Sequence, residues 1–488
     1  MMAPDPSPVA TAIPPVRLLG WVFDYKYAVA IVYVSAIFLD ILDTAIVNVA
    51  LPTLAADFHT SAVEWVVLGY TLSLAVWIPA SGWLADRYGT RRILLTAITM
   101  FLAGSALCGS ADSIGQLIAY RVVQGVGGGM IAPVGIAMMF RAFAPSERAR
   151  ASMFAMVPTL LAPALGPIIG GYLIGSWGWR WIFYINLPIG SLVLAFGWLV
   201  LREHREPTAG RFDVAGFFLS AGALTLVLFA LSEGSRAGWS SASVVVTGLV
   251  GLVLAVATVI VETRVEAPML ALRLFKDAMF RKTNLVNLFS MAGFFGMIFL
   301  VPLYLQTLRG FTPLQAGQAT FTQAIGVVIS SQISGRLYGT VGPRRLIFGG
   351  LLSASFVNAA YVLLDTDSGP WTVRWLFLVR GFCMGFAFVP MQAATYSTIK
   401  PADNGRASSI FSTMRQVSVS VSVAVLATVL AGFTPVGRPA TDVVRALRGF
   451  RASYLVAAGM TAVAALLALR INDDDAAASM KVRSSAGA

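Results

Sequence analysis

The sequence predicts an all-α integral membrane protein, built from two six-helix halves with two helices inserted between them. Three observations lead to this fold class: a low content of charged residues, a series of long apolar runs, and a similarity between the two ends of the chain. Of the 488 residues, 57% are hydrophobic and only 12% are charged, whereas a soluble domain is roughly 25% charged. This deficit extends along the whole length and excludes a soluble multidomain architecture.

Fourteen apolar runs are long enough to cross a bilayer as helices, which takes about 20 residues. They lie at residues 27–50, 62–84, 93–111, 114–139, 149–174, 180–201, 212–232, 242–262, 284–307, 314–336, 345–364, 372–398, 406–431 and 451–470. An even number places both termini on one side. Of the 35 Lys and Arg residues, 24 lie on that side, 8 on the opposite side and 3 within helices. This bias predicts a multi-pass membrane protein with both termini in the cytoplasm.

The two ends of the chain repeat one another. GWLADRYGTRR, starting at Gly82, matches GRLYGTVGPRR, starting at Gly335, at an offset of 253 residues, and Arg121 matches Arg380 at an offset of 259. Matches in one order with a nearly constant offset predict two homologous halves. The expected parts are a disordered cytoplasmic tail (1–26), an N-terminal six-helix half (27–201), an inserted helix pair (212–263), a C-terminal six-helix half (284–470) and a cytoplasmic tail (471–488).

The first apolar run carries two carboxylates, Asp40 and Asp43. Because they are three residues apart, they share one face of a helix. A carboxylate near the bilayer centre costs roughly 2.5–3.5 kcal/mol on insertion scales, and a purely structural helix does not require two. We therefore expect these side chains to face a water-filled cavity, where they exchange protons or meet a cation.

Arg121 lies inside the fourth apolar run, next to Gln124 and Gly125. An arginine within a membrane helix must face a cavity or a partner, and a nearby guanidinium tunes the proton affinity of a carboxylate. We expect Arg121 to do this for one of the acids in the first run. The alternative is a side chain that reaches to the membrane interface, because Arg121 is only about two turns from a helix end.

A short turn between the second and third runs combines glycines with charges. Its candidate gate residues are Gly82, Asp86, Arg87, Gly89, Arg91 and Arg92. A tight charged turn can latch two helices in one state and release them in another, and the repeated copy favours this over a basic loop that only sets topology. The copy has Gly339 where the first turn has Asp86, so the carboxylate latch is expected in one half only.

The fifth apolar run is rich in glycine and proline. Its expected interface residues are Gly166, Pro167, Gly170 and Gly171. Small residues at a spacing of four allow close helix contact, and prolines permit bending. The run therefore suits an interface that slides or hinges, with static close packing as the alternative.

Several polar residues in the second half are candidates to line a substrate cavity. They are Asn287, Gln323, Gln392, Tyr396 and Arg415. Each could instead be a polar side chain satisfied within the protein. Cavity lining and internal satisfaction are about equally expected across the set.

Other classes of chemistry have no support in the sequence. There is no Walker sequence, no glycine-rich nucleotide loop after a strand, and no catalytic Ser/His spacing. The chain has only two Cys and two His residues, so no catalytic residue, metal site, cofactor or disulfide framework is expected, and the protein is not expected to be an enzyme. The net charge of +12 lies between apolar runs and indicates lipid headgroups, not nucleic acid.

Four stretches, taken in order, resemble motifs of the fourteen-helix drug:proton antiporter branch of the major facilitator superfamily. They are LDTAIVNVALP (42–52), GWLADRYGTRR (82–92), RVVQG (121–125) and GPIIGG (166–171). The resemblance implies the major facilitator fold. It implies that Asp43 is the family's acidic position in the first helix, that Arg121 serves proton coupling, and that Asp86 docks around residues 406–409 in one conformational state. Asp40 looks like an extra acid.

The resemblance also implies a function. It implies export of small hydrophobic, often cationic drugs or toxic compounds in exchange for protons, by alternating access and with the proton gradient as the driving force. A monomer is expected, and a periplasmic adaptor protein stays an open alternative. Two rival functions remain: a dedicated exporter of one metabolite, lipid or siderophore, and, from another class, a non-transporting membrane sensor or scaffold.

Overall fold

A computed structural model describes residues 16–18, 21–60, 63–144, 147–206, 210–265, 268–433 and 443–480. Apart from a small hairpin, β1 (Val16–Leu18) and β2 (Trp21–Phe23), the regular secondary structure of the described chain is helical. Its α-helices are α1 (Tyr25–Asp57), α2 (Glu64–Tyr88), α3 (Thr90–Gly109), α4 (Ile114–Ala142), α5 (Arg148–Trp177), α6 (Trp181–Tyr184), α7 (Asn186–Val200), α8 (Val214–Ala237), α9 (Ala242–Arg264), α10 (Ala278–Thr307), α11 (Pro313–Thr320), α12 (Thr322–Val341), α13 (Pro343–Ala360), α14 (Pro370–Thr395), α15 (Asn404–Ala431) and α16 (Val443–Ala468). Short 3₁₀ helices lie at Leu272–Lys276, Tyr361–Leu363, Pro401–Asp403 and Asp473–Ser479.

Each of the fourteen predicted runs falls on helix. Twelve helical segments in the described part of the chain are long and apolar enough to cross a membrane. The other two runs correspond to α5 and to the α11–α12 pair. Two runs that we predicted as continuous are interrupted: 180–201 divides into α6 and α7 at Ile185, and 314–336 divides into α11 and α12 at Phe321.

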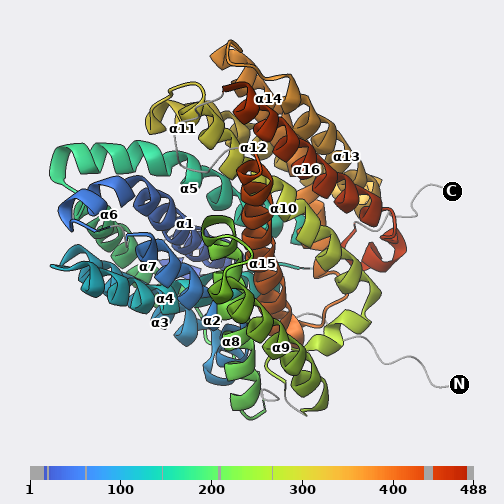
Figure 1. The fold of residues 1–488 in the computed structure, drawn as a ribbon. Helices are drawn as coiled ribbons and strands as arrows, with labels where there is room; N and C mark the ends of the chain where they lie inside the picture. The colour runs from blue at the N-terminus through green and yellow to red at the C-terminus, as the bar shows by residue number, and fades with distance from the viewer. Residues whose placement is uncertain are drawn as a thin grey trace, which may run out of the picture.

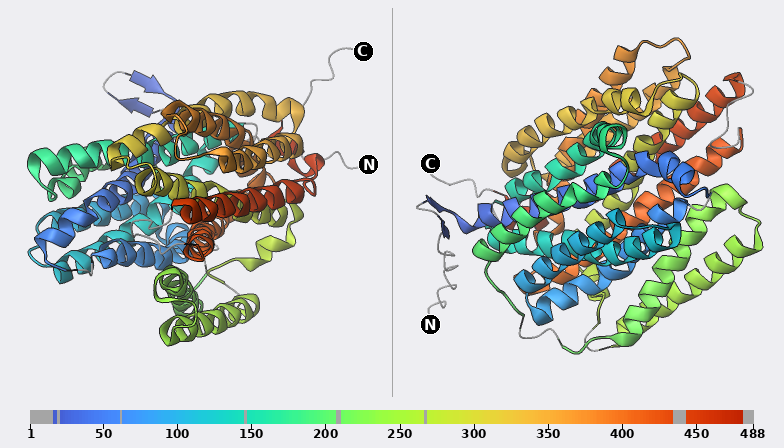
Figure 2. Two further views of the ribbon diagram at one scale, coloured as in Figure 1. Left: turned by 45° about the horizontal axis from the view of Figure 1, so that its top comes forward. Right: turned by 90° about the vertical axis from the view of Figure 1, so that its left-hand side faces the viewer.

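The helices form two groups and a separate pair. In the first group, α1 packs against α4, α5 and α7, and α4 packs against α2 and α3. In the second group, α10 packs against α15 and α16, and α14 packs against α12 and α13. The groups meet where α15 contacts α2 and α4 and where α5 contacts α11, α12 and α14. Helices α8 and α9 pack on each other at the periphery, and α8 contacts α2 and α15 (Figures 1 and 2).

Both ends of the described chain lie at one end of the bundle (Figure 2, right). We call this the terminal end and the opposite one the distal end. The turn from α2 to α3 and the turn from α12 to α13 lie here and are built alike. Gly89 and Gly342 have φ of 107° and 87°, a conformation that favours glycine. Glu203 accepts the N–H of Arg91, and Asp473 accepts the N–H of Arg344, so the internal repeat extends to the acid that holds each turn.

Burial is inverted relative to a soluble protein. Charged side chains such as Asp43 and Arg121 are fully buried, whereas Leu192 is 73% and Phe218 is 69% exposed. Large apolar side chains on the outside and polar ones inside are what a bilayer requires, because lipid solvates the apolar surface. The core of the first group is formed by aliphatic and aromatic side chains of α1, α3 and α4.

The two terminal segments differ from the prediction. Within 1–26, which we expected to be disordered, β1 and β2 pair as an antiparallel hairpin and α1 already begins at Tyr25. Residues 1–15 and 19–20 lie outside the described part. Within 471–488, a 3₁₀ helix covers Asp473–Ser479, and 481–488 lie outside the described part.

Candidate functional site

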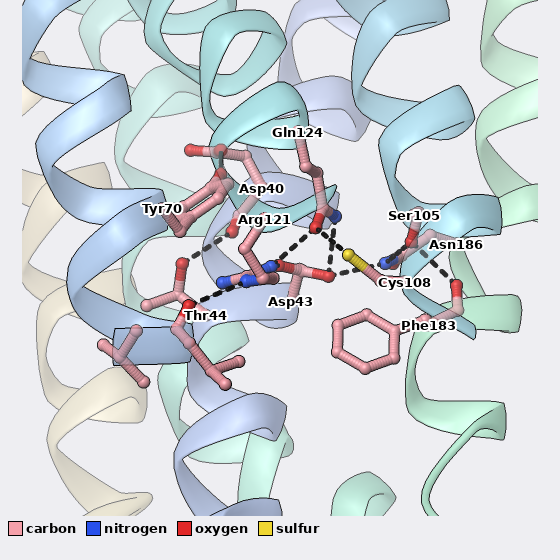
Figure 3. A network of polar contacts seen from close by, with 12 residues as sticks. Asp40, Asp43, Thr44, Tyr70, Ser105, Cys108, Arg121, Gln124, Phe183 and Asn186 are labelled. Carbon is pink, nitrogen blue, oxygen red and sulfur yellow. Dashed lines mark hydrogen bonds and ion pairs between the residues drawn. The ribbon is translucent and has the colours of Figure 1, made fainter. Parts of the chain in front are cut away.

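A buried ion pair joins α1 to α4 inside the first helix group. The Arg121 guanidinium donates to Asp43 Oδ2 at 2.5 Å, and both side chains have 0% exposure. The other carboxylate oxygen, Oδ1, accepts from Gln124 at 3.0 Å and from Asn186 at 2.8 Å. Figure 3 shows these side chains converging on Asp43 from α4 and α7. Asp43 is therefore held by one full positive charge and two amide donors.

Arg121 makes further contacts besides the one with Asp43. Its Nε donates to the carbonyl of Val66 at 3.1 Å, and Nη1 also donates to Gln124 Oε1 at 2.7 Å. The guanidinium lies over the ring of Tyr70, 4.1 Å from its centroid, a favourable cation–π contact. The side chain thus points into the helix group, and the alternative that it reaches to the membrane interface is wrong for this structure.

Tyr70 links the second carboxylate to the same cluster. Its hydroxyl donates to Asp40 Oδ1, while its ring lies under Arg121. Asp40 also packs against Gly128, where an added Cβ would stand 2.6 Å from Oδ1. The two acids that share a face of α1 are therefore connected through one tyrosine and one arginine. We call the set Asp40, Asp43, Tyr70, Arg121, Gln124 and Asn186 the polar network.

The ion pair couples two helices. Breaking a buried ion pair by removing one partner leaves an uncompensated charge and costs about 3–5 kcal/mol. Asp43 lies on α1 and Arg121 on α4, so a change of charge at either residue changes how favourably these two helices pack.

Sequence reasoning missed two members of the network. Asn186 sits at the break between α6 and α7, from which it donates to Asp43 and to Ser105 Oγ at 2.9 Å. The available signal was an amide within the apolar stretch WIFYINLPIG. Tyr70 carried no such signal, because an aromatic residue in a membrane helix is ordinary.

Asp86 and Gly82 meet the second helix group at the terminal end. An added Cβ on Gly82 would lie 2.6 Å from the carbonyl oxygen of Gly405, so α2 and α15 touch through backbone. Asp86, which is 2% exposed, lies against Gly405 in the first turn of α15. A helix N-terminus favours a negative charge. The resemblance implied docking at residues 406–409, and the contact found is with the residue just before them.

Further contacts close the terminal end between the two groups. Ser408 donates to the carbonyl of Pro133 at 2.7 Å, and the hydroxyls of Ser81 and Ser409 are 3.3 Å apart. Arg148 donates to the carbonyl of Tyr396. These contacts join α2, α4 and α5 to α14 and α15 and their connection, so the terminal end of the interface is shut.

The other predicted gate residues do not contact the second helix group. Arg87 is exposed, and Gly89 forms the turn itself. The backbone N–H groups of Arg91 and Arg92 donate to the carboxylate of Glu203 at 3.1 and 3.3 Å. Arg91 and Arg92 thus hold the α2–α3 turn to the segment after α7, within the first group.

The glycines of α5 divide between two surroundings. Gly166 and Gly170 face α1, where added Cβ atoms would lie 2.5 Å from the Ala45 methyl group and 3.2 Å from the Ile46 side chain. Gly171 has open space around it. Pro167 contacts Gly317 of α11. The row Gly166–Gly170 therefore permits close approach of α1 and α5, while Pro167 lies at the meeting of the two groups.

A cavity of about 390 Å³ opens between the groups toward the distal end. It lies within the range of about 300–1,000 Å³ that is typical of small-molecule sites. Its walls come from α1, α5, α10, α11, α12 and α14, and its polar lining includes Asn48, Gln306 and Gln323. Nearer the centre, an enclosed space of about 20 Å³ is lined in part by Gln392 and Arg415.

The residues that we predicted to line a substrate cavity therefore lie in different places. Gln323 faces the distal cavity, and Gln392 and Arg415 face the central space. Asn287 is fully buried and does not line either of these two spaces. The Tyr396 ring stacks on the Phe140 ring at the closed terminal end, with the ring centroids 4.4 Å apart.

Arg380, the repeat partner of Arg121, is also fully buried but lacks a carboxylate among the described residues. Its guanidinium donates to Asn358 Oδ1 at 2.8 Å, to Gln323 Oε1, and to the carbonyl of Phe294 at 2.7 Å. The two halves thus place an arginine at equivalent positions, but only Arg121 is neutralised by a carboxylate. Among the described residues, no group of three or more His, Cys, Asp and Glu side chains is arranged to hold a metal.

The chain belongs to the major facilitator superfamily, since residues 33–423 match that family's profile. A relative named "Multidrug resistance protein B homolog" of Mycobacterium tuberculosis strain H37Rv is 35% identical over 80% of this chain and 73% of its own length. "Putative multidrug resistance protein MdtD" of Serratia proteamaculans is 31% identical over 90% of this chain and 92% of its own.

Solved structures agree on the fold. The human organic anion transporter MFSD10 matches with a TM-score of 0.65 at 15% identity, covering 91% of this chain and 99% of its own. The proton:xylose symporter XylE matches with a TM-score of 0.62 at 15% identity, covering 91% of this chain and 94% of its own. The major facilitator fold that the sequence motifs implied is thereby confirmed.

Proposed function

We propose that this protein is a proton-coupled efflux antiporter that exports small hydrophobic compounds, including drugs and toxic compounds, across the inner (plasma) membrane. The observation that carries the proposal is the Asp43–Arg121 ion pair, buried in a helix group of a transporter fold. A charge pair at this depth is costly in a static protein. It has a use if a proton titrates it during each cycle.

The geometry corresponds to one state of an alternating-access cycle. The groups are in contact at the terminal end and separated by the 390 Å³ cavity toward the distal end. We propose that residues 27–201 and 284–470 act as the two moving halves, with 212–263 as an inserted pair. Since 24 of the 35 basic residues lie on the side of the termini, we take the terminal end as cytoplasmic. The state is then outward-facing.

The proton step follows from this assignment. In the outward-facing state a proton reaches Asp43, Arg121 is freed from its counter-charge, and the contacts of α1 with α4 and α5 rearrange. Reopening at the terminal end then separates Asp86 and Gly82 from α15. The proton leaves to the cytoplasm as the next substrate enters. Gly166 and Gly170 let α1 slide along α5 during this change, because they have no side chain between α5 and the Ala45 and Ile46 side chains of α1.

The relatives named as multidrug resistance proteins support broad export over a dedicated exporter of one metabolite, lipid or siderophore. A non-transporting sensor or scaffold has less support, because the chain belongs to the major facilitator superfamily. The proposed protein works as a monomer in the lipid bilayer, takes its energy from the proton gradient, and needs neither a cofactor nor nucleic acid. A periplasmic adaptor would extend the path beyond the membrane without changing this step.

Purified protein in liposomes tests the proposal. An imposed pH gradient should drive accumulation of hydrophobic dyes or drugs, and a protonophore should abolish it. Expression in a susceptible host should raise resistance to several unrelated compounds. Resistance to a single compound would favour the dedicated exporter, and absence of flux for every compound, with folded protein, would contradict the proposal.

A further inference from the structure

The central space between the helix groups has a defined chemical character. It is lined from both groups, by Tyr33 of α1, Phe294 of α10, Phe388 of α14 and Phe411 of α15 among others. At about 20 Å³ it has room for roughly one water molecule. A drug-sized ligand therefore requires that the space widen, which separation of the two groups in the proposed cycle would allow.

Two polar atoms in its wall have no partner among the described residues. Gln392 is 2% and Ser412 is 1% exposed, and neither Gln392 Oε1 nor Ser412 Oγ has a hydrogen bond there. Both residues line the space. Buried polar atoms are normally hydrogen-bonded, so these two atoms are available to a water molecule or to a ligand that enters the space.

Arg415 gives the space its charge. It is half-buried and lines the space, and within the described part of the chain its side chain forms no hydrogen bond or ion pair. The Asp40 carboxylate interacts electrostatically with Arg415, but it already accepts a hydrogen bond from the Tyr70 hydroxyl. Tyr33 and Tyr396 are the other titratable groups in electrostatic range of Arg415. Asp43 forms its ion pair with Arg121.

We propose that the central space is a binding site for compounds with an aromatic body and an anionic group, such as an aromatic carboxylate. This inference rests on the proposed function and narrows its substrate class. Arg415 binds the anionic group, because an unpaired guanidinium in a low-dielectric site attracts an anion and repels a cation. Gln392 and Ser412 satisfy polar substituents, and the phenylalanines pack on the ring.

Three probes with one aromatic body separate charge from shape: 2-naphthoate, neutral 2-naphthamide and 2-naphthylmethylammonium. Their binding is measured on the purified full chain. The wild type should bind naphthoate about tenfold or more tightly than the ammonium compound. Arg415→Gln should remove this preference while changing naphthamide binding less than about threefold, and Arg415→Lys should retain most of it. Arg374→Gln is the matched control, since Arg374 contacts the exposed Trp371.

Each outcome decides a different point. A wild type that prefers the ammonium compound overturns the inference. So does Arg415→Gln if it weakens all three probes equally, because Arg415 would then hold structure and not recognise charge. If none of the probes binds while gradient-driven drug flux is intact, the inference fails and the proposed function stands. If the charge pattern appears as expected but no probe or drug is driven by a pH gradient, the proposed function fails instead.

Discussion

At the scale of residues, the polar network sets one guanidinium against a carboxylate that it contacts directly. Arg121 contacts Asp43 at 2.5 Å and reaches Asp40 only through Tyr70. The network is therefore asymmetric: one acid neutralises the arginine, and the other receives a neutral hydroxyl donor. This asymmetry assigns distinct parts to the two acids, which sequence spacing alone treats as equivalent.

Arg121→Gln should destabilise the protein by about 3–5 kcal/mol, because it leaves the Asp43 carboxylate buried without a counter-charge. The double variant Asp43→Asn with Arg121→Gln should recover part of this loss, since amides then face each other and no charge is stranded. Thermal unfolding in detergent measures both. Equal destabilisation of the single and double variants would contradict the view that the two charges depend on each other.

Tyr70 should act through its ring and its hydroxyl separately. Tyr70→Phe keeps the aromatic face under Arg121 and removes only the donor to Asp40, so gradient-driven flux should fall less than about threefold at its optimum pH. Tyr70→Ala removes both contacts and should cost about tenfold or more. Initial rates across a pH series compare the two. An alanine variant as active as the phenylalanine variant would exclude the cation–π contact from the mechanism.

At the scale of elements, closure of the terminal end depends on how near α2 comes to α15. Gly82 stands against the Gly405 carbonyl and the Ser409 hydroxyl, each 2.6 Å from an added Cβ. A Cβ atom at this position would clash with both groups. Because one belongs to the backbone and the other to a short side chain, the clash could be relieved only by moving a helix. The contact is thus specific to the closed arrangement.

Gly82→Val should therefore disfavour the closed terminal end and lower the initial rate of export by about tenfold or more. Gly171→Val on α5 is the matched control, because nothing lies within 4 Å of its added Cβ, and it should export at nearly the parental rate. Flux into liposomes gives both numbers. A Gly82→Val protein that transports normally would show that α2 and α15 need not approach this closely.

At the scale of the whole molecule, apolar length and the internal repeat predict the helices and their order well. The structure departs where a side chain overrides hydropathy, as at the α6–α7 break that brings Asn186 to Asp43. The sequence predicts that Arg121 acts on an acid of the first run, but the residue spacing does not say on which one. The direct contact with Asp43 and the bridge to Asp40 through Tyr70 depend on helix packing, which periodicity does not encode. The shut terminal end is likewise a property of one conformational state.

The central claim is that Asp43 couples substrate movement to the proton. Its most direct test compares two assays on Asp43→Asn in liposomes. Uphill accumulation driven by a pH gradient should be lost, while exchange of labelled for unlabelled substrate at equal concentrations should persist, because exchange needs alternation but no net proton transfer. Asp112→Asn, whose parent side chain is 85% exposed, should leave both intact. Gradient-driven accumulation at the parental rate by Asp43→Asn would contradict the account.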